Sequence, residues 1–244
     1  MGWKARVLAG TGVIAAAAAI GRAAAVRRRQ ETGDTRQALH RIRTLYDHGA
    51  GRYDRAMDVL DRWLFAGSRR WVAGQAQGSV LEVAAGSGRN VRYYPAAARV
   101  TAVDLSTVML ERARARAMAA GHHVDLQAGD AQALAFRDGS FDTVVCTLGL
   151  CTIPDERRAL QEAWRVLKPG GQLLLLEHVR SSRPVVSAVQ RLLDPLACLL
   201  ASDHLRRDPL PVAAATGFEI LRVDRLVLDI IERVAARKPL YTSW

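Results

Sequence analysis

Short apolar runs alternate along the chain with longer stretches in which apolar residues recur every three or four positions. The short runs, bounded by small or polar residues, predict strands at 80–83, 99–104, 123–128, 142–148, 172–177, 218–227 and 229–237. The longer stretches predict helices over 35–74, 106–121, 154–167 and 185–200. This alternation is typical of an α/β fold on a mainly parallel sheet, and we expect residues 229–237 to form an antiparallel last strand.

Two of the helical stretches carry local signals. Gly49 and Gly51 predict a break in the N-terminal helical stretch. Ser106 predicts the N-cap of the next helix, and Gly121 predicts its end. We expect that helix to present a solvated face formed by Arg112, Arg114 and Arg116.

A turn of small residues, 84–88, follows the first predicted strand. Gly86 and Gly88 permit positive φ angles and let a ligand approach the backbone closely. Backbone N–H groups at the start of a following helix would face that ligand. A βα turn without a ligand also uses small residues, so the turn alone favours a nucleotide-like ligand only modestly.

The second predicted strand ends in an acid, Asp104, roughly 20 residues beyond the glycine turn. An acid at this position is placed to accept hydrogen bonds from a ribose diol. A pyrophosphate-binding turn would carry a third glycine, but Arg89, Asn90 and Val91 follow Gly88. A ligand with a ribose and a cation but no phosphate fits better, and S-adenosylmethionine has this description. A nicotinamide-dependent oxidoreductase is the alternative that the missing glycine disfavours.

Five motifs, in order and in spacing, resemble those of class I S-adenosylmethionine-dependent methyltransferases with a methyltransferase type 11 domain. They are Leu81-Glu82-Val83-Ala84-Ala85-Gly86-Ser87-Gly88, Val103-Asp104-Leu105-Ser106, Gly129-Asp130-Ala131, Phe141-Asp142-Thr143-Val144-Val145 and Arg165-Val166-Leu167-Lys168-Pro169-Gly170-Gly171. Ala84 stands where the family's first motif has its first glycine. The resemblance implies a Rossmann-like, doubly wound, seven-stranded sheet, mostly parallel with one antiparallel strand, plus N-terminal helices.

The resemblance also implies roles for individual residues at the cofactor. The expected cofactor-binding residues are Glu82, Ala84, Ala85, Gly86, Gly88, Asp104, Leu105, Met109, Asp130, Ala131 and Leu148. Among these, Asp130 is expected to accept a hydrogen bond from the adenine amino group, and the Ala131 backbone is expected beside the ring.

On the acceptor side, the N-terminal helices of such enzymes help to shape the pocket. We therefore expect acceptor contacts from Tyr46, Tyr53, Cys151 and Glu177. His178, at the carboxyl end of the fifth predicted strand, is the candidate general base, and a scaffold role for it is equally open. No metal site is predicted.

Further stretches narrow the resemblance to the methyltransferase-like seven group. They include Val145-Cys146-Thr147-Leu148-Gly149-Leu150-Cys151, Leu176-Glu177-His178-Val179 and Leu193-Asp194-Pro195. Members of that group are membrane-associated through an N-terminal hydrophobic segment and methylate small thiols, and bacterial relatives methylate phospholipids or quinones. Where the group has Asp-Gly-Cys, this chain has Ser202-Asp203-His204, so the acceptor's identity does not carry over.

Positive charge is concentrated at the N-terminus. The formal net charge is +11, and residues 1–45 contribute +7 of it, from nine Lys and Arg against two acids. Residues 7–21 are uncharged and rich in alanine, with basic residues on both sides. We expect a membrane anchor or an interfacial helix on an anionic membrane surface; a signal peptide and a soluble alanine-rich helix are the alternatives. The absence of interleaved aromatics disfavours a nucleic-acid partner.

The chain has three cysteines, an odd number without metal-ligand spacing, which argues against a disulfide framework and for a reducing compartment. We expect an anchor segment at 1–30, a helical cap at 31–75 and an S-adenosylmethionine-binding domain at 76–244. The predicted localisation is cytoplasmic and membrane-associated.

The sequence therefore predicts an S-adenosylmethionine-dependent methyltransferase that transfers a methyl group to a small-molecule acceptor by in-line displacement. One alternative is a phospholipid or quinone methyltransferase at the membrane. Another is a catalytically dead, membrane-associated binding protein on the same fold. A thiolate acceptor needs little base, whereas an amine or hydroxyl must lose a proton, and His178 is a candidate helper for that step.

Overall fold

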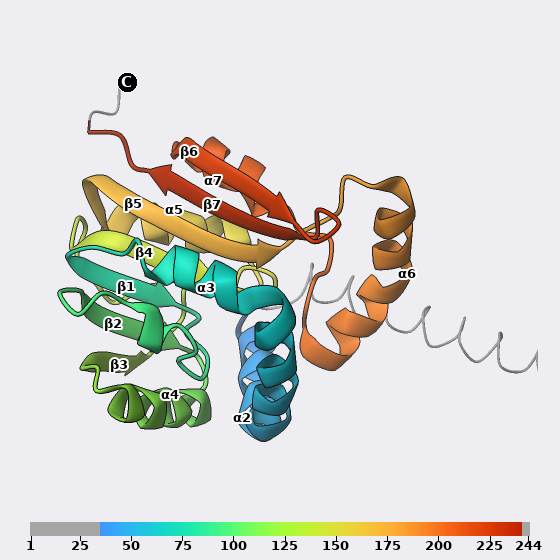
Figure 1. The fold of residues 1–244 in the computed structure, drawn as a ribbon, viewed down its shortest axis with the longest axis horizontal. Helices are drawn as coiled ribbons and strands as arrows, with labels where there is room; N and C mark the ends of the chain where they lie inside the picture. The colour runs from blue at the N-terminus through green and yellow to red at the C-terminus, as the bar shows by residue number, and fades with distance from the viewer. Residues whose placement is uncertain (1–34, 241–244) are drawn as a thin grey trace, which may run out of the picture.

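The computed structural model describes residues 35–240, which form one seven-stranded sheet with helices packed on it (Figure 1). The strands are β1 (Ser79–Val83), β2 (Arg99–Asp104), β3 (Val124–Ala128), β4 (Phe141–Thr147), β5 (Leu167–His178), β6 (Glu219–Leu226) and β7 (Ile231–Arg237). Their order is β3-β2-β1-β4-β5-β7-β6, and β7 runs antiparallel to both of its neighbours. The predicted Rossmann-like fold is confirmed. The predicted anchor segment, 1–30, lies outside the described residues.

The helical elements are α2 (Thr35–Leu60), η1 (Asp61–Phe65, a π-helical turn), α3 (Ala66–Ala73), η2 (Val91–Tyr93, a 3-10 turn), α4 (Thr107–Ala120), α5 (Glu156–Val166), α6 (Pro184–Ala201) and α7 (Pro209–Thr216). Both predicted ends of α4 are confirmed. The Ser106 hydroxyl accepts a hydrogen bond from the Met109 N–H, and Gly121 ends the helix with a left-handed φ of 66°.

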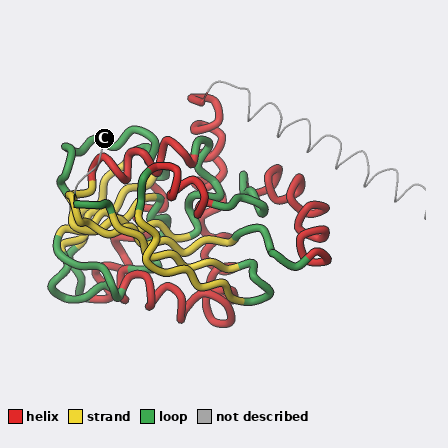
Figure 2. The backbone as a smooth tube through the Cα atoms, turned by 90° about the horizontal axis from the view of Figure 1, so that it is seen from above, coloured by secondary structure: helices red, strands yellow, loops and turns green. Residues whose placement is uncertain are grey.

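The core lies on both faces of the sheet, because successive side chains of a strand point to opposite faces. Leu81 on β1 belongs to one buried cluster, which includes Leu160 of α5 and Ala213 of α7. Val80, its neighbour on the same strand, belongs to the other cluster, which includes Val72 of α3. Seen from above, the strands accordingly run between helices on either side (Figure 2).

The predicted break at Gly49 and Gly51 is wrong, because α2 continues through both residues. A glycine inside a helix costs about 1 kcal/mol relative to alanine. Packing compensates here, since Ala50 between the two glycines is buried. Gly51 also leaves room for a neighbouring helix: a Cβ at this position would lie 3.4 Å from Nη2 of Arg112.

Two other boundaries differ from expectation. No α-helix starts directly after the small-residue turn, because turns and η2 fill residues 84–93. The predicted row of free N–H groups at a helix start is therefore not present at this turn. In addition, β5 begins at Leu167, where it pairs with Phe141 across a register shift, instead of at residue 172.

The strand order reverses between β1 and β4, which are adjacent and parallel. In open α/β sheets, ligands bind in the crevice outside the carboxyl ends of the strands at this reversal. Helix α2 stands next to these carboxyl ends (Figure 1). A crevice lies at this place, lined by residues of α2 and of the ends of β1, β2 and β4.

Gly88 fixes the distance between the small-residue turn and α4. Its φ is +75°, and a Cβ here would lie 2.8 Å from both the Cα and the Cβ of Ala113. Gly121 also has a positive φ, +66°, but a Cβ there would meet nothing within 4 Å. Substituting alanine at Gly88 and at Gly121 therefore separates two costs in free energy: that of the left-handed backbone, which both share, and that of the clash with Ala113, which only Gly88 has.

We expect Gly121→Ala to lower the free energy of unfolding by about 1 kcal/mol, the cost of a left-handed alanine. Gly88→Ala is expected to lower it by about 2–4 kcal/mol, because overpacking against α4 adds to the same backbone cost. Urea unfolding followed by circular dichroism measures both. If both variants lost the same free energy of unfolding, α4 would have moved away from the added methyl group at no cost, and the clash would be refuted.

Candidate functional site

The turn after β1 is held in an unusual backbone conformation. Ala84, Gly86 and Gly88 all have positive φ, and the value for Ala84 is 51°. An alanine in this region costs about 1–2 kcal/mol relative to glycine. The Ala84 methyl also requires a glycine at position 149, because a Cβ on Gly149 would lie 2.7 Å from the Cβ of Ala84. Alanine at 84 and glycine at 149 therefore form a matched pair between the ends of β1 and β4.

The carboxylate of Asp104, at the end of β2, fastens this turn. Its Oδ2 accepts from the Gly86 N–H at 2.7 Å, and its Oδ1 accepts from the Ser106 N–H at 2.8 Å. Burial raises the pKa of Asp104, and the backbone hydrogen bonds offset only part of this effect. A carboxylate has about four acceptor positions. Two hydrogen bonds leave acceptor capacity for hydroxyl groups of a ligand.

A cavity lies between α2 and the carboxyl ends of β1 to β4, with about 790 Å³ of empty volume including its open mouth. Of the predicted cofactor residues, its lining includes Ala84, Ala85, Gly86, Asp104, Leu105, Met109, Asp130, Ala131 and Leu148. These residues come from four separate strand ends.

Two predicted cofactor residues, Gly88 and Glu82, are not part of this lining. Gly88 packs against α4, as described above. Glu82 is buried behind the turn, where its carboxylate accepts from Asn90 Nδ2 and from the Tyr94 hydroxyl, each at 2.8 Å. Burial raises the pKa of Glu82 to about 7, against the lowering effect of these two hydrogen bonds. Glu82 thus supports the residues that follow the turn.

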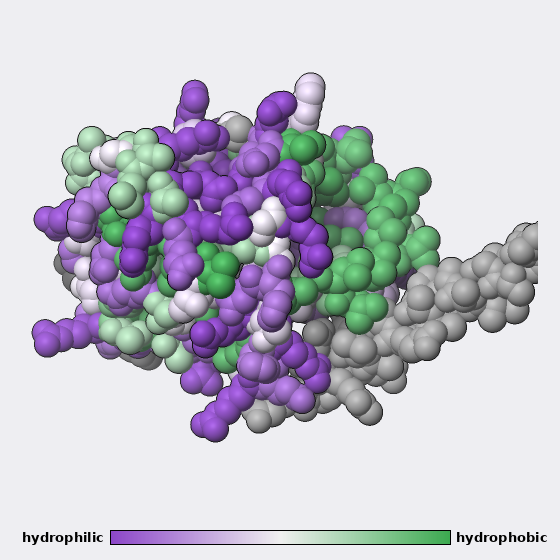
Figure 3. Space-filling model, turned by 90° about the horizontal axis from the view of Figure 1, so that it is seen from below, coloured by the Kyte–Doolittle hydropathy of each residue, from purple (hydrophilic) through white to green (hydrophobic). Residues whose placement is uncertain are grey.

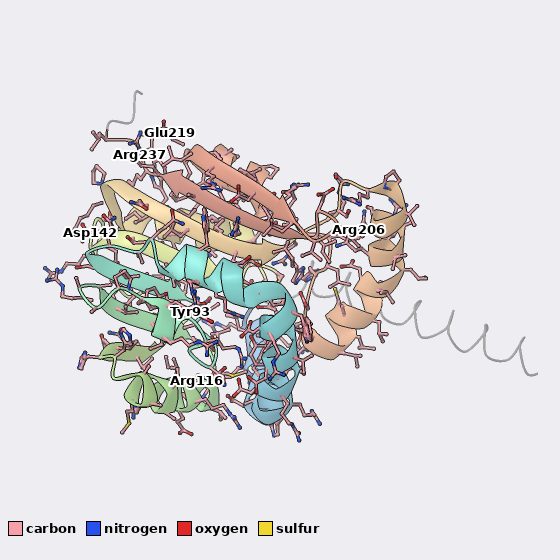
Figure 4. The ribbon with its side chains drawn as sticks, viewed as in Figure 1. Tyr93, Arg116, Asp142, Arg206, Glu219 and Arg237 are labelled. Atoms are coloured by element: carbon pink, nitrogen blue, oxygen red, sulfur yellow. The ribbon has the colours of Figure 1, made fainter. Side chains whose placement is uncertain are left out.

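Helix α2 is joined to the turn by a network of ion pairs around Asp54. The Asp54 carboxylate accepts from the Ser87 hydroxyl at 2.6 Å, from Arg89 at 3.2 Å, and from Arg112 and Arg116 on α4 at 2.9 Å each. Burial opposes ionisation, but Ser87 and the two arginines of α4 lower the pKa of Asp54 below its ordinary value. Arg116 lies between α4 and α2 in Figure 4. The predicted solvated face is therefore confirmed only in part: Arg114 is exposed, whereas Arg112 and Arg116 are half-exposed and pair with Asp54.

The network continues through η1. Arg89 also pairs with Asp58 at 2.6 Å and with Asp61 at 2.5 Å, and Asp61 pairs in turn with buried Arg69 at 2.7 Å. Arg69 then donates to Asn90, the partner of Glu82. Both Arg69 and Arg89 line the cavity. The sequence did not reveal these residues as parts of a site, because their partners lie 8 to 35 positions away.

Two tyrosines from α2, Tyr46 and Tyr53, line the cavity as expected for the acceptor side. Their rings meet edge to face with centroids 5.8 Å apart. Burial raises the pKa of Tyr53 to about 12 and that of Tyr46 well above 10. Both phenols are therefore neutral near pH 7, and neither supplies a phenolate base.

The other three acceptor-side candidates, Glu177, Cys151 and His178, are not in the lining. Glu177 is buried, and its Oε1 accepts from the N–H groups of Gly149 and Leu150 at 3.0 Å each. It therefore holds the loop after β4, whose Leu148 and Gly149 do face the cavity.

We call the part of the lining formed by Tyr46, Tyr53 and the loop after β4 the acceptor wall. His178 lies behind this wall, with its Nε2 2.7 Å from Oδ1 of Asp203. Burial lowers the pKa of His178, but the hydrogen bond and the charge of Asp203 outweigh it, so the pKa is raised above 6.5. Cys151 is buried beside this pair, and its thiol donates to the Leu148 carbonyl at 3.5 Å. The structure brings these residues together but does not place them on the cavity surface.

Residues of metal-ligating type gather twice near this wall among residues 35–240. The two groups are Cys151, His178 and Asp203, and Asp194, Cys198 and His204, with ligand atoms within 4.8 Å of one another in each. Sequence spacing gave no sign of the first group, because it combines the end of β5 with the loops after β4 and α6; the second group lies on α6 and the loop that follows it. The hydrogen bonds of His178, Cys151 and Cys198 already engage several of these atoms.

Comparisons with known proteins agree with the geometry. A family model described as "Methyltransferase domain" matches residues 81–175. Human thiol S-methyltransferase TMT1A is 31% identical over 180 residues, which cover 71% of this chain and 73% of that enzyme. Demethylmenaquinone methyltransferase of Deinococcus radiodurans is 33% identical over 171 residues, 67% of this chain and 71% of that enzyme.

Among solved structures, a SAM-dependent methyltransferase from Thermotoga maritima, described as a possible histamine N-methyltransferase, superposes with a TM-score of 0.62. It is 21% identical, and the match covers 81% of this chain and 99% of that chain. At this identity the likeness shows the fold alone.

The buried carboxyl of Glu82 makes stability depend on pH. Its pKa is 4.5 unfolded and about 7 folded, so the folded state binds more protons between these values. The free energy of unfolding therefore falls as pH rises through this window, by up to about 1.4 kcal/mol per pH unit. We expect Glu82→Gln to remove this contribution, so that its stability relative to the unsubstituted chain increases between about pH 5 and pH 7. Urea unfolding at several pH values measures the difference.

Glu111→Gln is the matched control, because Glu111 is an exposed carboxyl on α4. Its difference from the unsubstituted chain should change little across the same range. A pH-independent difference for Glu82→Gln would mean that Glu82 is ionised throughout.

Proposed function

The chain belongs to the S-adenosylmethionine-dependent methyltransferases, and we propose that its acceptor is a small, apolar thiol. It is a small-molecule methyltransferase with S-adenosylmethionine as cofactor. When bound, S-adenosylmethionine supplies a methyl group on a cationic sulfur, which the acceptor takes by in-line displacement. In the proposed reaction a thiolate sulfur forms the new bond to the methyl carbon, the bond from that carbon to the cofactor's sulfur breaks and leaves a neutral thioether, and the thiol proton passes to water.

The cavity residues fit this cofactor. We assign Asp104 to the ribose hydroxyls, because its carboxylate is partly buried, faces the cavity and keeps acceptor capacity. Asp130 and the Ala131 backbone are assigned to the adenine, and Leu105, Met109 and Leu148 to its apolar surroundings. Ala84, Ala85 and Gly86 allow close approach of the ligand to the backbone, while Gly88 and Glu82 act indirectly by shaping the turn.

The observation that carries the thiol assignment is the chemistry of the acceptor wall. Among residues 35–240, the cavity lining contains no histidine, and its two phenols are neutral. An amine or a hydroxyl acceptor must lose a proton to a positioned base. A thiol has a pKa near 8.5, so a few per cent is thiolate at pH 7 without a base.

We propose that Glu177, Cys151 and His178 position the acceptor wall and do not touch the acceptor. Glu177 fixes the loop after β4 through two backbone hydrogen bonds. The pair of His178 and Asp203 joins the end of β5 to the segment that follows α6. In this proposal His178 is a positioning residue.

A quinone or its reduced form is the second candidate acceptor. The similarity to the Deinococcus radiodurans demethylmenaquinone methyltransferase favours it, and so do the apolar side chains of Leu39, Ile42, Ile153 and Pro154 in the lining. Methylation at a ring carbon is assisted by removal of a proton from the neighbouring hydroxyl. The lack of an imidazole in the lining makes this candidate second to the thiol.

We also propose that the enzyme is cytoplasmic and associates with an anionic membrane surface through its N-terminal segment. The uncharged, alanine-rich residues 7–21 and the basic residues around them support this proposal. An apolar thiol or quinone partitions into membranes, so such a location would raise its concentration near the cavity.

The acceptor is identified by transfer of isotope-labelled methyl from S-adenosylmethionine to a series of alkyl and aryl thiols and to a reduced naphthoquinone. We expect methyl sulfides as products, with kcat/KM rising with the thiolate fraction of each acceptor. His178→Ala is the control and should keep this dependence, because His178 does not contact the acceptor. Methylation of the quinol carbon and of no thiol would replace the thiol by the quinone. Binding of the cofactor without any transfer would favour the catalytically dead alternative.

We expect Asp104→Ala to weaken S-adenosylmethionine binding by more than tenfold, because hydrogen bonds to a charged group are each worth about 1.5–3 kcal/mol. Isothermal titration calorimetry measures the change. Asp125→Ala is the control, since Asp125 is exposed on the neighbouring strand β3. Unchanged affinity in the Asp104 variant would remove the ribose assignment.

A further inference from the structure

Helix α6 exposes a continuous apolar stripe. Val185, Val189, Leu192, Leu196 and Leu199 follow one another at intervals of four, three, four and three residues, which places them on one side of a helix. All five are between 46% and 77% exposed. The helix stands apart from the sheet in Figure 1, and an apolar surface covers this end of the molecule in Figure 3.

The stripe extends beyond α6 to the tip of the β6–β7 hairpin. Val227 and Leu228 at that tip are exposed. The hairpin tip is joined to the start of α6, because the Ser181 hydroxyl donates to the Leu228 carbonyl at 2.6 Å and Arg183 pairs with Asp229 at 3.4 Å. Monomeric soluble proteins rarely expose large contiguous apolar patches, and those they do expose usually bind something.

The charges around the stripe are mainly positive. Residues 180–207 contain five arginines and two aspartates, and two of the arginines are already engaged, because Arg183 pairs with Asp229 and Arg207 donates to the carbonyls of Leu150 and Ile153. Asp194 is buried, and Asp203 is paired with His178. Arg191 is exposed on α6 itself, and Arg206 lies beside the helix in Figure 4, on a segment whose Leu205 carbonyl accepts from Gln190 of α6.

Within residues 35–240, α6 is the one helix whose length and hydropathy would suffice to cross a bilayer. Its contacts argue for a location along the bilayer surface instead. The Tyr46 hydroxyl of α2 donates to the Ala201 carbonyl at the end of α6, and Ser181 before its start is fixed to the hairpin. Both ends therefore stay on the domain, and the helix cannot separate them by a membrane.

We propose that α6 and the β6–β7 hairpin tip form a docking surface for an anionic lipid bilayer, with the leucine stripe in the acyl boundary and the arginines among the headgroups. A leucine- and valine-rich face flanked by arginines has the composition of interfacial helices. A second copy of this chain would bring like charges together and is disfavoured for that reason. The inference deepens the proposed membrane association, but it concerns a surface separate from the N-terminal segment.

The test places an environment-sensitive fluorophore on α6 in the full chain, through Leu192→Cys. The three native cysteines are buried, so the introduced thiol is the accessible one among the described residues. We expect a blue shift on adding vesicles of phosphatidylcholine and phosphatidylglycerol, and quenching by lipids that carry a spin label at shallow acyl positions. Met118→Cys is the control, because Met118 is an exposed apolar residue on α4. Its probe should report water with and without vesicles.

Vesicle flotation of the same samples separates this surface from the N-terminal segment. Flotation with an unshifted probe at position 192 would overturn the docking surface and leave the N-terminal proposal intact. A blue shift without vesicles would also overturn it, because the stripe would then be covered by protein. Absence of flotation would overturn both proposals.

A second experiment tests the contribution of positive charge with Arg191→Gln. Arg114→Gln is the control, because Arg114 is an exposed arginine on α4. We expect Arg191→Gln to weaken binding to anionic vesicles about fivefold, which corresponds to roughly 1 kcal/mol per arginine at such a surface. Equal affinities for the two variants would contradict the assigned position of Arg191.

Discussion

The interaction on which the site depends is the network of ion pairs that fastens α2 and η1 to the turn after β1. Asp54 and Asp61 are buried acids, and each is surrounded by guanidinium groups from the turn or from neighbouring helices. Loss of one member would leave an uncompensated buried charge, which destabilises a protein far more than loss of an exposed pair. The network therefore holds α2 at a fixed height above the strand ends, and the cavity exists because that height is fixed.

The fold could be predicted from the sequence because its signals are local. The apolar runs, the Ser106 cap and the Gly121 terminus each act within a few residues, and the order of elements follows from them. The network could not be predicted in this way. Arg89 and Asp54 are 35 positions apart, and Arg112 and Asp54 are 58 apart, so only the folded chain shows that these charges meet. Burial of Ala50 is likewise visible only in the folded chain, and it accounts for the continuation of α2 through Gly49 and Gly51, where propensity alone predicts a break.

The site itself was predictable only in part, for a related reason. Motif positions identified residues whose backbones or side chains lie at strand ends, and most of those line the cavity. The motif pattern does not distinguish a residue that faces the cavity from one that supports it. Glu82, Gly88, Glu177 and His178 stand at motif positions, yet each acts from behind the wall. Burial of such a residue can be unfavourable, as it is for the ionisable carboxyl of Glu82. Hydrogen bonds from Asn90 and Tyr94 offset part of that cost.

The acceptor wall and the α6 surface support one account of substrate choice. The acceptor wall offers neutral phenols and apolar side chains, which support the proposed acceptor, one that ionises without help and is otherwise apolar. Such a molecule concentrates at a bilayer. Tyr46 belongs to the cavity lining, and its hydroxyl contacts the end of α6, so the wall and the proposed docking surface are joined by one side chain. A bilayer on the leucine stripe would thus lie against the helix that ends at the acceptor side, which shortens the path of an apolar acceptor from lipid to cavity.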